Sequence, residues 1–268
     1  MGETVGILKQ MYSYFSINKS GVNIRCKLYC NDIDKIDSIV VFGHGFAGHK
    51  DNKAAEKLAD RVQKHSENTA LFIFDWPGHG DDINETLKLS SCMKYLYIVI
   101  EYVRSRFCTE RIFGCATSFG GYLYLKYISD NGNPFVKTVL RCPAINMYEV
   151  LTEKIMTSED LESIRKGRSA VVGFDRKVRV TTDFILELKE NDICSYDYCS
   201  HKDRIAIIHG TKDEIVSFDV VKHFAEKNEI PFIAVDSADH RFTDPRKMDE
   251  VIYRMIDEFS IPQSISTT

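Results

Sequence analysis

The chain is 268 residues long, with 44% hydrophobic and 28% charged residues, so a globular α/β domain with a large core is expected. Its formal net charge of −4 and its lack of basic clusters exclude a nucleic-acid partner. The longest apolar segment, residues 95–103, is too short to cross a bilayer, which excludes a membrane-spanning helix.

The amino terminus and the cysteines indicate the compartment. Residues 1–6 lack a basic segment followed by an apolar one, so no secretory signal is expected. The eight cysteines are scattered and form no Cys-x-x-Cys pair of the kind that metal and redox motifs require. We therefore expect reduced, mostly buried thiols and a cytoplasmic location. A disulfide or a thiol-rich host is the alternative.

The first elements in chain order are two strands and the start of a parallel sheet. Residues 8–30 alternate polar and apolar side chains around a break at 19–21, which predicts two antiparallel strands. Residues 38–42 form a continuous apolar run, typical of a strand buried on both faces. The glycine-rich loop 43–50 would let backbone approach a ligand closely, while a plain turn before a helix at 51–64 is the alternative.

Strands and helices then alternate. Residues 71–75 predict another buried strand, which ends in a turn rich in Pro and Gly. A helix that runs to Arg106 is expected to begin at a cap formed by Ser90 or Ser91. Two more strands are predicted near 112–117 and at 135–142. This alternation predicts a mostly parallel, doubly wound sheet with right-handed crossovers.

Residues 144–199 interrupt the alternation. Their pattern predicts a hairpin at 171–180 and short helices near 149–156, 158–166 and 183–189. An insertion beside the carboxyl edge of a sheet can form a lid over a ligand crevice, and a simple surface excursion is the alternative. The sheet pattern returns in strands at 204–209 and 231–235 and helices at 218–228 and 245–259. We expect one domain over residues 1–268 with a lid at about 144–199.

Ser118 lies where a strand-prone run changes into a buried helix. Small residues stand two positions before it (Ala116) and two positions after it (Gly120), which is the pattern of a nucleophile elbow. Such a turn is too tight for flanking side chains, and it presents the serine Oγ beside a helix N-terminus. A serine that only caps the helix is the alternative.

Two further residues complete a candidate catalytic set. A serine hydroxyl needs a base within hydrogen-bond reach, and a carboxylate must orient that base. Asp213 and His240 each follow a later predicted strand. Because parallel strands end at the same edge of a sheet, we expect both side chains to converge on Ser118.

The chain resembles the α/β-hydrolase superfamily over nearly its whole length. The resemblance rests on the order serine, acid, histidine and on five motifs: His-Gly-Phe at 44–46, Asp-Trp-Pro-Gly-His-Gly at 75–80, Ala-Thr-Ser-Phe-Gly-Gly at 116–121, His-Gly-Thr-Lys-Asp-Glu-Ile-Val at 209–216 and Asp-His at 239–240. Within the superfamily, the chain looks like the cytoplasmic bacterial serine esterases related to cinnamoyl/feruloyl esterases, monoacylglycerol lipases and serine aminopeptidase-like hydrolases.

The resemblance implies an α/β-hydrolase fold with a small lid and assigns two further residues. Phe46 and Phe119 would supply backbone N–H groups to an oxyanion hole. The chain departs from the usual motif at Ala116, where glycine is common, and at Thr117, where histidine is commoner. The second departure leaves the substrate preference open.

We therefore expect a serine hydrolase that cleaves carboxylic esters through an acyl-enzyme. Ser118 would be the nucleophile, His240 the base and Asp213 the carboxylate that orients it. Small or aromatic-acyl esters of the cinnamoyl/feruloyl kind are favoured. An acylglycerol lipase, a serine aminopeptidase or amidase, and a non-catalytic binding protein on the same fold are the alternatives. The expected partner is a small-molecule ester, with neither a metal nor a cofactor, and the oligomeric state stays open.

Overall fold

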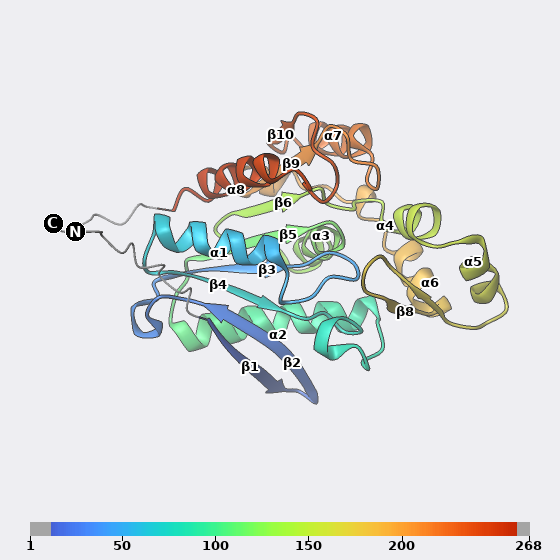
Figure 1. Cartoon of the computed structure of the whole chain (residues 1–268), viewed down its shortest axis with the longest axis horizontal. Coiled ribbons are helices and arrows are strands. Elements are labelled where there is room, and N and C mark those ends of the chain that lie inside the picture. The colour runs from blue at the N-terminus through green and yellow to red at the C-terminus, as the bar shows by residue number, and fades with distance from the viewer. Residues whose placement is uncertain (1–11, 262–268) are drawn as a thin grey trace, which may run out of the picture.

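The computed structural model describes residues 12–261. The first residues of the predicted amino-terminal strand, 8–11, and the segment 1–6 that was examined for a signal lie outside the described residues. The termini of the described chain lie at the same end of the molecule (Figure 1).

An eight-stranded sheet forms the centre of the molecule (Figure 1). Its strands lie in the spatial order β1 (Tyr12–Lys19), β2 (Val22–Tyr29), β4 (Thr69–Phe74), β3 (Ser38–Gly43), β5 (Ile112–Thr117), β6 (Thr138–Arg141), β9 (Ile205–Gly210) and β10 (Phe232–Val235). The pairs from β4 to β10 are parallel, whereas β2 is antiparallel to both of its neighbours. The predicted mostly parallel sheet is therefore confirmed.

Helices cover both faces of the sheet and enclose two apolar cores. On one face lie α1 (Lys53–His65) and α8 (Pro245–Phe259), which pack against the strands through residues such as Val62 and Ile252. The opposite core includes residues of α2 (Leu89–Phe107), α3 (Phe119–Asn131) and α7 (Phe218–Lys227). The central strands β3, β4, β5, β6 and β9 are buried at every residue, as continuous apolar runs predict.

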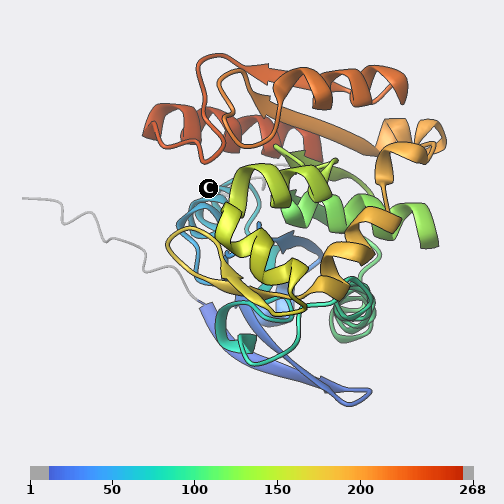
Figure 2. The ribbon, with the colours of Figure 1, turned by 90° about the vertical axis from the view of Figure 1, so that its right-hand side faces the viewer.

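The insertion between β6 and β9 is a group of short elements at one end of the sheet (Figure 2). It consists of α4 (Met147–Glu149), the π-helical turn η3 (Val150–Ile155), α5 (Ser158–Arg165), the hairpin strands β7 (Ala170–Val172) and β8 (Val178–Val180), α6 (Thr182–Glu190) and the short turns η4 (Ile193–Ser195) and η5 (Cys199–Arg204). A side chain at Gly173 in the hairpin loop would meet Ala47 Cβ at 2.9 Å. The hairpin therefore touches the loop at the carboxyl end of β3.

The predicted cap of α2 is wrong. The helix begins at Leu89, before both serines, and Lys88 is the N-cap residue. The Leu89 N–H instead donates to Glu187 Oε2 in α6 at 2.7 Å. A carboxylate satisfies a free N–H and favours the positive end of the helix dipole, so the insertion supplies the cap.

Across residues 12–261, the helices are all too short or too polar to cross a membrane. Four of the cysteines, Cys26, Cys92, Cys115 and Cys142, are buried as free thiols. Cys108 is exposed.

Candidate active site

Ser118 occupies a strained turn between β5 and α3. Its backbone has φ 53° and ψ −118°, a region that residues other than glycine rarely adopt. Its hydroxyl is bonded to a ring nitrogen of His240 rather than to the helix. The strained turn and this contact favour the nucleophile elbow over a simple helix cap.

Close backbone contacts explain the small residues of this turn. A Cβ on Gly120 would lie 2.4 Å from the Gly43 carbonyl oxygen and 2.7 Å from that of His44. A Cβ on Gly121 would lie 2.7 Å from Pro143 Cβ. Ala116 is fully buried. The glycine-rich loop after β3 therefore lies directly against the start of α3.

The structure brings the three predicted catalytic side chains together. His240 Nε2 lies 3.0 Å from Ser118 Oγ, and His240 Nδ1 lies 2.7 Å from Asp213 Oδ2. The three residues follow β5, β9 and β10, whose carboxyl ends lie at one edge of the sheet. Because Nδ1 faces a carboxylate, it carries the ring proton, and Nε2 is left to accept from the Ser118 hydroxyl.

Asp213 is held by more donors than the sequence predicts. Its Oδ1 accepts from the backbone N–H groups of Ile215 (2.9 Å) and Val216 (2.7 Å). Its Oδ2 lies 3.2 Å from His209 Nε2 as well as beside His240. Burial alone would raise the pKa of the Asp213 carboxyl, but the hydrogen bonds from His209 and His240 outweigh it and hold that pKa well below its usual range. The carboxylate is therefore ionised.

Sequence reasoning did not assign a role to His209. Its Nε2 faces two acceptors, Asp213 Oδ2 and the Val216 carbonyl oxygen at 3.1 Å, so this nitrogen carries the proton. The side chain is fully buried at the end of β9. The spacing of four residues between His209 and Asp213 was the only sequence feature that could have indicated a contact between them. The folded turn is needed to show that both side chains point the same way.

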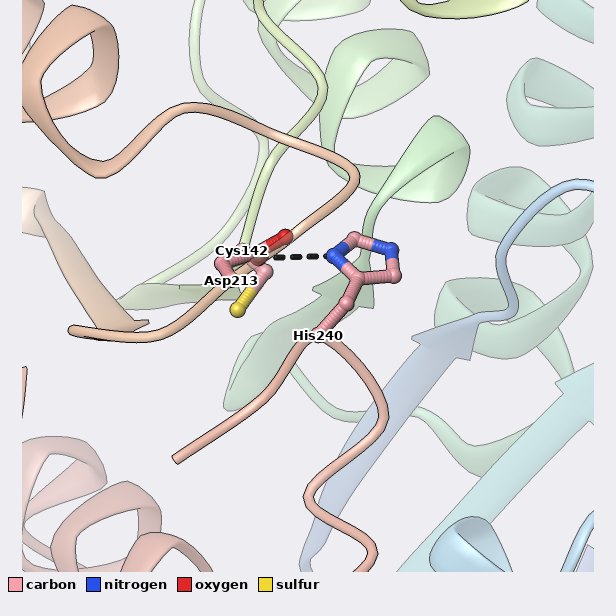
Figure 3. Close-up of side chains that lie close together, drawn as sticks. All are labelled: Cys142, Asp213 and His240. Atoms are coloured by element: carbon pink, nitrogen blue, oxygen red, sulfur yellow. Dashed lines mark hydrogen bonds and ion pairs between the residues drawn. The ribbon is translucent and has the colours of Figure 1, made fainter. Parts of the chain in front are cut away.

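Cys142 lies beside Asp213 and His240 (Figure 3). One ligand atom from each of the three residues lies within 4.8 Å of the others, which raises the question of a metal ion. Burial and the neighbouring Asp213 raise the pKa of the Cys142 thiol well above its usual range, which favours the thiol over the thiolate that binds metals. The donor set therefore fits a hydrogen-bonded Asp–His pair better than a metal site.

The two predicted oxyanion-hole residues flank Ser118. A Cβ on Gly45, the residue before Phe46, would lie 3.2 Å from Ser118 Cβ, so this loop passes directly against Ser118. Phe119 is the first residue of α3, where helix N–H groups lack partners in a preceding turn. The rings of Phe46 and Phe119 are in edge contact, with centroids 5.9 Å apart.

A buried ion pair fixes the loop that carries Phe46. Asp75 accepts from the Lys50 backbone N–H at 2.7 Å and from Lys50 Nζ at 3.2 Å, and the same ammonium group contacts Asp81. The Asp81 N–H also donates to Asp75 at 2.9 Å. The loops after β3 and β4 are therefore joined through one carboxylate, a connection that sequence reasoning missed because it links separate segments.

A cavity of about 500 Å³ opens over Ser118 and His240. The loop after β3 forms one wall, and the insertion contributes Ile155, Phe174 and Arg176. Thr117 and Arg141 line the cavity beside Ser118. A small organic substrate would fit a cavity of this size.

The mostly parallel sheet, the elbow and the loops at its carboxyl edge define the α/β-hydrolase fold. Residues 34–172, just over half of the chain, match the family described as "Serine aminopeptidase, S33". The chain belongs to this family, and it is a serine-type hydrolase of the α/β class. No curated protein matches the chain significantly.

Several solved structures share the fold at low sequence identity. A soluble variant of monoglyceride lipase from Saccharomyces cerevisiae has a TM-score of 0.73 and 13% identity, with 99% of this chain and 100% of that chain covered. Est1E from Butyrivibrio proteoclasticus has a TM-score of 0.70 and 15% identity, with 92% and 99% covered. Mouse alpha/beta hydrolase domain-containing protein 10 has a TM-score of 0.66 and 16% identity, with 91% and 97% covered. At these identities the likeness concerns the fold.

Proposed function

We propose that the chain hydrolyses carboxylic esters through an acyl-enzyme, with Ser118, His240 and Asp213 as the catalytic residues. The observation that carries the proposal is the unbroken path from Ser118 Oγ through the His240 ring to Asp213, with steps of 3.0 and 2.7 Å. These distances lie within hydrogen-bond reach, which a nucleophile and its base require.

The reaction follows from this arrangement. His240 Nε2 takes the Ser118 proton while Oγ attacks the ester carbonyl carbon. Asp213 keeps the ring oriented and stabilises its positive charge. The tetrahedral intermediate collapses, and His240 gives the proton to the departing alkoxide. Water, activated by the same ring, then cleaves the acyl-enzyme and restores Ser118.

Phe46 and Phe119 would stabilise the oxyanion of the intermediate with their backbone N–H groups. Their positions on either side of Ser118 support this role. Loss of one such donor costs about 3 to 4 kcal/mol in the transition state. We further propose that residues 144–199 act as a lid, because Ile155, Phe174 and Arg176 of this insertion line the cavity.

The finer substrate class is part of the proposal. Small or aromatic-acyl esters are favoured, and a structure of Est1E contains bound ferulic acid, with a TM-score of 0.69 and 16% identity to this chain. The yeast monoglyceride lipase and the serine aminopeptidase family point to acylglycerols and to amides as second candidates. A non-catalytic binding protein is less favoured because the three side chains are connected.

Two measurements test the proposal. A fluorophosphonate probe should label the native chain at Ser118, because only an activated serine reacts. A panel of aryl-acyl esters, acylglycerols and aminoacyl amides should show the highest kcat/KM for the ester class. Ser118→Ala should lower kcat by several orders of magnitude, whereas Ser105→Ala, in α2, should not. Equal activity of Ser118→Ala and the native chain would refute the proposal.

The cytoplasmic location is also a proposal, and cell fractionation would test it. The enzyme should remain with the cytoplasmic fraction. Recovery with membranes or in the medium would contradict this.

A further inference from the structure

Arg141 is a buried cation at the base of the active-site cavity. It ends β6, its side chain lines the cavity, and the residue is 7% exposed. Within residues 12–261, its guanidinium forms one weak hydrogen bond, from Nη1 to Met248 Sδ at 3.6 Å, and lies over the Phe242 ring, 5.4 Å from the ring centroid. No carboxylate in this part of the chain forms an ion pair with it. Its buried Nε lacks a partner in the same part of the chain.

This arrangement leaves the charge of Arg141 without a carboxylate partner among the described residues, and the Phe242 ring offsets only part of it. A guanidinium keeps its proton at any physiological pH, so it cannot become neutral as a buried lysine can. Burial lowers the pKa of Arg141, while Asp213 and Asp239 act on it from a distance. Asp213 already accepts bonds from His209 and His240, and Asp239 accepts bonds from Thr243. A buried cation without a partner is unfavourable unless something else supplies the negative charge.

A second unsatisfied polar group lies next to Arg141. Thr117 is 8% exposed, and its Oγ1 is buried without a partner among the described residues. Thr117 and Arg141 are direct register partners in the parallel strands β5 and β6, so their side chains project from the same face of the sheet. The Ser118 N–H donates to the Arg141 carbonyl oxygen at 3.0 Å. Both polar groups are therefore next to the nucleophile.

The rest of the cavity wall is also cationic. Besides Arg141 it contains Lys53, Arg176 and Arg241, against one carboxylate, Asp175. Asp175 is bonded to Arg241 at 3.2 Å. The formal charges of these lining side chains thus sum to about +3, in a chain whose formal net charge is −4. Such a concentration of positive charge attracts an anionic ligand.

We propose that the substrate of this site carries a carboxylate, which Arg141 binds with its paired N–H groups while the Thr117 hydroxyl donates a further hydrogen bond. The planar fork of a guanidinium matches the two oxygens of a carboxylate. This inference rests on the proposed ester hydrolysis at Ser118 and narrows its substrate class. The ester bond would lie over Ser118, and the carboxylate would lie toward α8, where Met248 touches Arg141.

Two matched pairs of esters test the preference. The first pair is the para-nitrophenyl monoester of glutaric acid and the corresponding ester of its neutral monoamide, which places the charge on the acyl side. The second pair is para-acetoxybenzoate and its methyl ester, which places it on the alcohol side. In at least one pair the anionic ester should have the higher kcat/KM, by about 10- to 100-fold, with most of the difference in KM. Equal or lower values for the anionic esters in both pairs would overturn the inference.

Variants of Arg141 test whether this side chain causes the preference for anionic esters. Arg141→Met should lower the ratio of kcat/KM for the anionic ester to kcat/KM for the neutral ester to about one. Arg141→Lys should retain part of the preference. Arg246→Met is the matched control, because Arg246 is exposed, pairs with Asp244 and lies outside the cavity lining. The control should keep the ratio. An unchanged ratio in Arg141→Met would refute the role of Arg141.

Thermal unfolding separates ligand binding from a structural role. Removing an unpaired buried charge should leave the Tm of Arg141→Met equal to or above that of the native chain. Glutarate should raise the Tm of the Ser118→Ala protein at constant ionic strength, and Arg141→Met should remove this shift. A larger shift with inorganic phosphate would identify a phosphate site and overturn the carboxylate assignment. If glutarate raises the Tm but the native chain hydrolyses none of the esters, the proposed ester hydrolysis at Ser118 is refuted. The anion site at Arg141 would still stand.

Discussion

His209 and His240 donate to the same oxygen, Oδ2 of Asp213, at 3.2 and 2.7 Å. The two rings lie on the loops and strand ends around β9 and β10, and the carboxylate between them is fully buried. An oxygen that accepts two N–H groups has little freedom to rotate. His209 therefore positions the carboxylate that orients His240, the proposed base.

Replacing His209 with alanine should weaken both stability and catalysis. Loss of a hydrogen bond to a buried carboxylate costs about 1.5 to 3 kcal/mol, which urea unfolding would measure. With one donor fewer, the Asp213 carboxylate would hold the His240 ring less firmly, so kcat/KM should also fall. His223→Ala, at an exposed position of α7, is the control and should change neither quantity. A native-like kcat/KM and an unchanged free energy of unfolding in His209→Ala would contradict this role.

The depressed pKa of Asp213 predicts how stability depends on pH. The pKa of this carboxyl is lower in the folded than in the unfolded chain, so its ionised form stabilises the fold. That contribution is complete above the unfolded value of about 3.9 and is lost as the pH falls toward the folded value. Native and Asp213→Asn proteins, unfolded in urea between neutral pH and acid, should therefore differ most at neutral pH. A difference that grows toward acid would have the wrong sign.

Gly120 should tolerate no side chain. A Cβ there would lie 2.4 Å from the Gly43 carbonyl oxygen, and neither backbone segment can move without displacing Ser118 or the loop before Phe46. Gly120→Ala should lower the free energy of unfolding by about 3 kcal/mol or more. Ser105→Ala, at an exposed position of α2, should change it by no more than about 0.5 kcal/mol. Chemical denaturation of both variants would decide, and similar midpoints would show that the contact relaxes.

Lys50→Met should disturb both stability and the proposed oxyanion hole. The substitution leaves the buried Asp75 carboxylate without its cation, and breaking a buried pair from one side costs about 3 to 5 kcal/mol. It also loosens the loop that carries Phe46, so kcat should fall while the KM for a neutral ester changes less. Lys64→Met removes an exposed pair with Asp60 and serves as the control. A native-like Tm for Lys50→Met would contradict the structural role of the pair.

Features that depend on local patterns could be predicted from the sequence. Continuous apolar runs indicated β3 and β5, and the position of Pro245 indicated the start of α8. The convergence of Ser118, Asp213 and His240 followed from the shared carboxyl edge of parallel strands, without any contact being known in advance.

Features that depend on which distant segments meet could not be predicted. The cap of α2 comes from Glu187, which is 98 residues from Leu89, so the two nearby serines were misleading. Arg141 looks like an ordinary charged residue at a strand end until its neighbours are known. Only the fold shows that, among residues 12–261, these neighbours include no carboxylate bonded to its guanidinium.

The bond from Glu187 to Leu89 has a consequence for how the cavity can open. It joins α6 to the first turn of α2. An outward movement of the whole insertion would therefore remove the Glu187 carboxylate from the N-terminus of α2. The hairpin of β7 and β8 has no such anchor to α2 in the described chain, and its tip rests on Ala47. If residues 144–199 act as the proposed lid, we expect the hairpin tip to lift, with loss of the Asp175–Arg241 pair, while α6 stays bonded to α2.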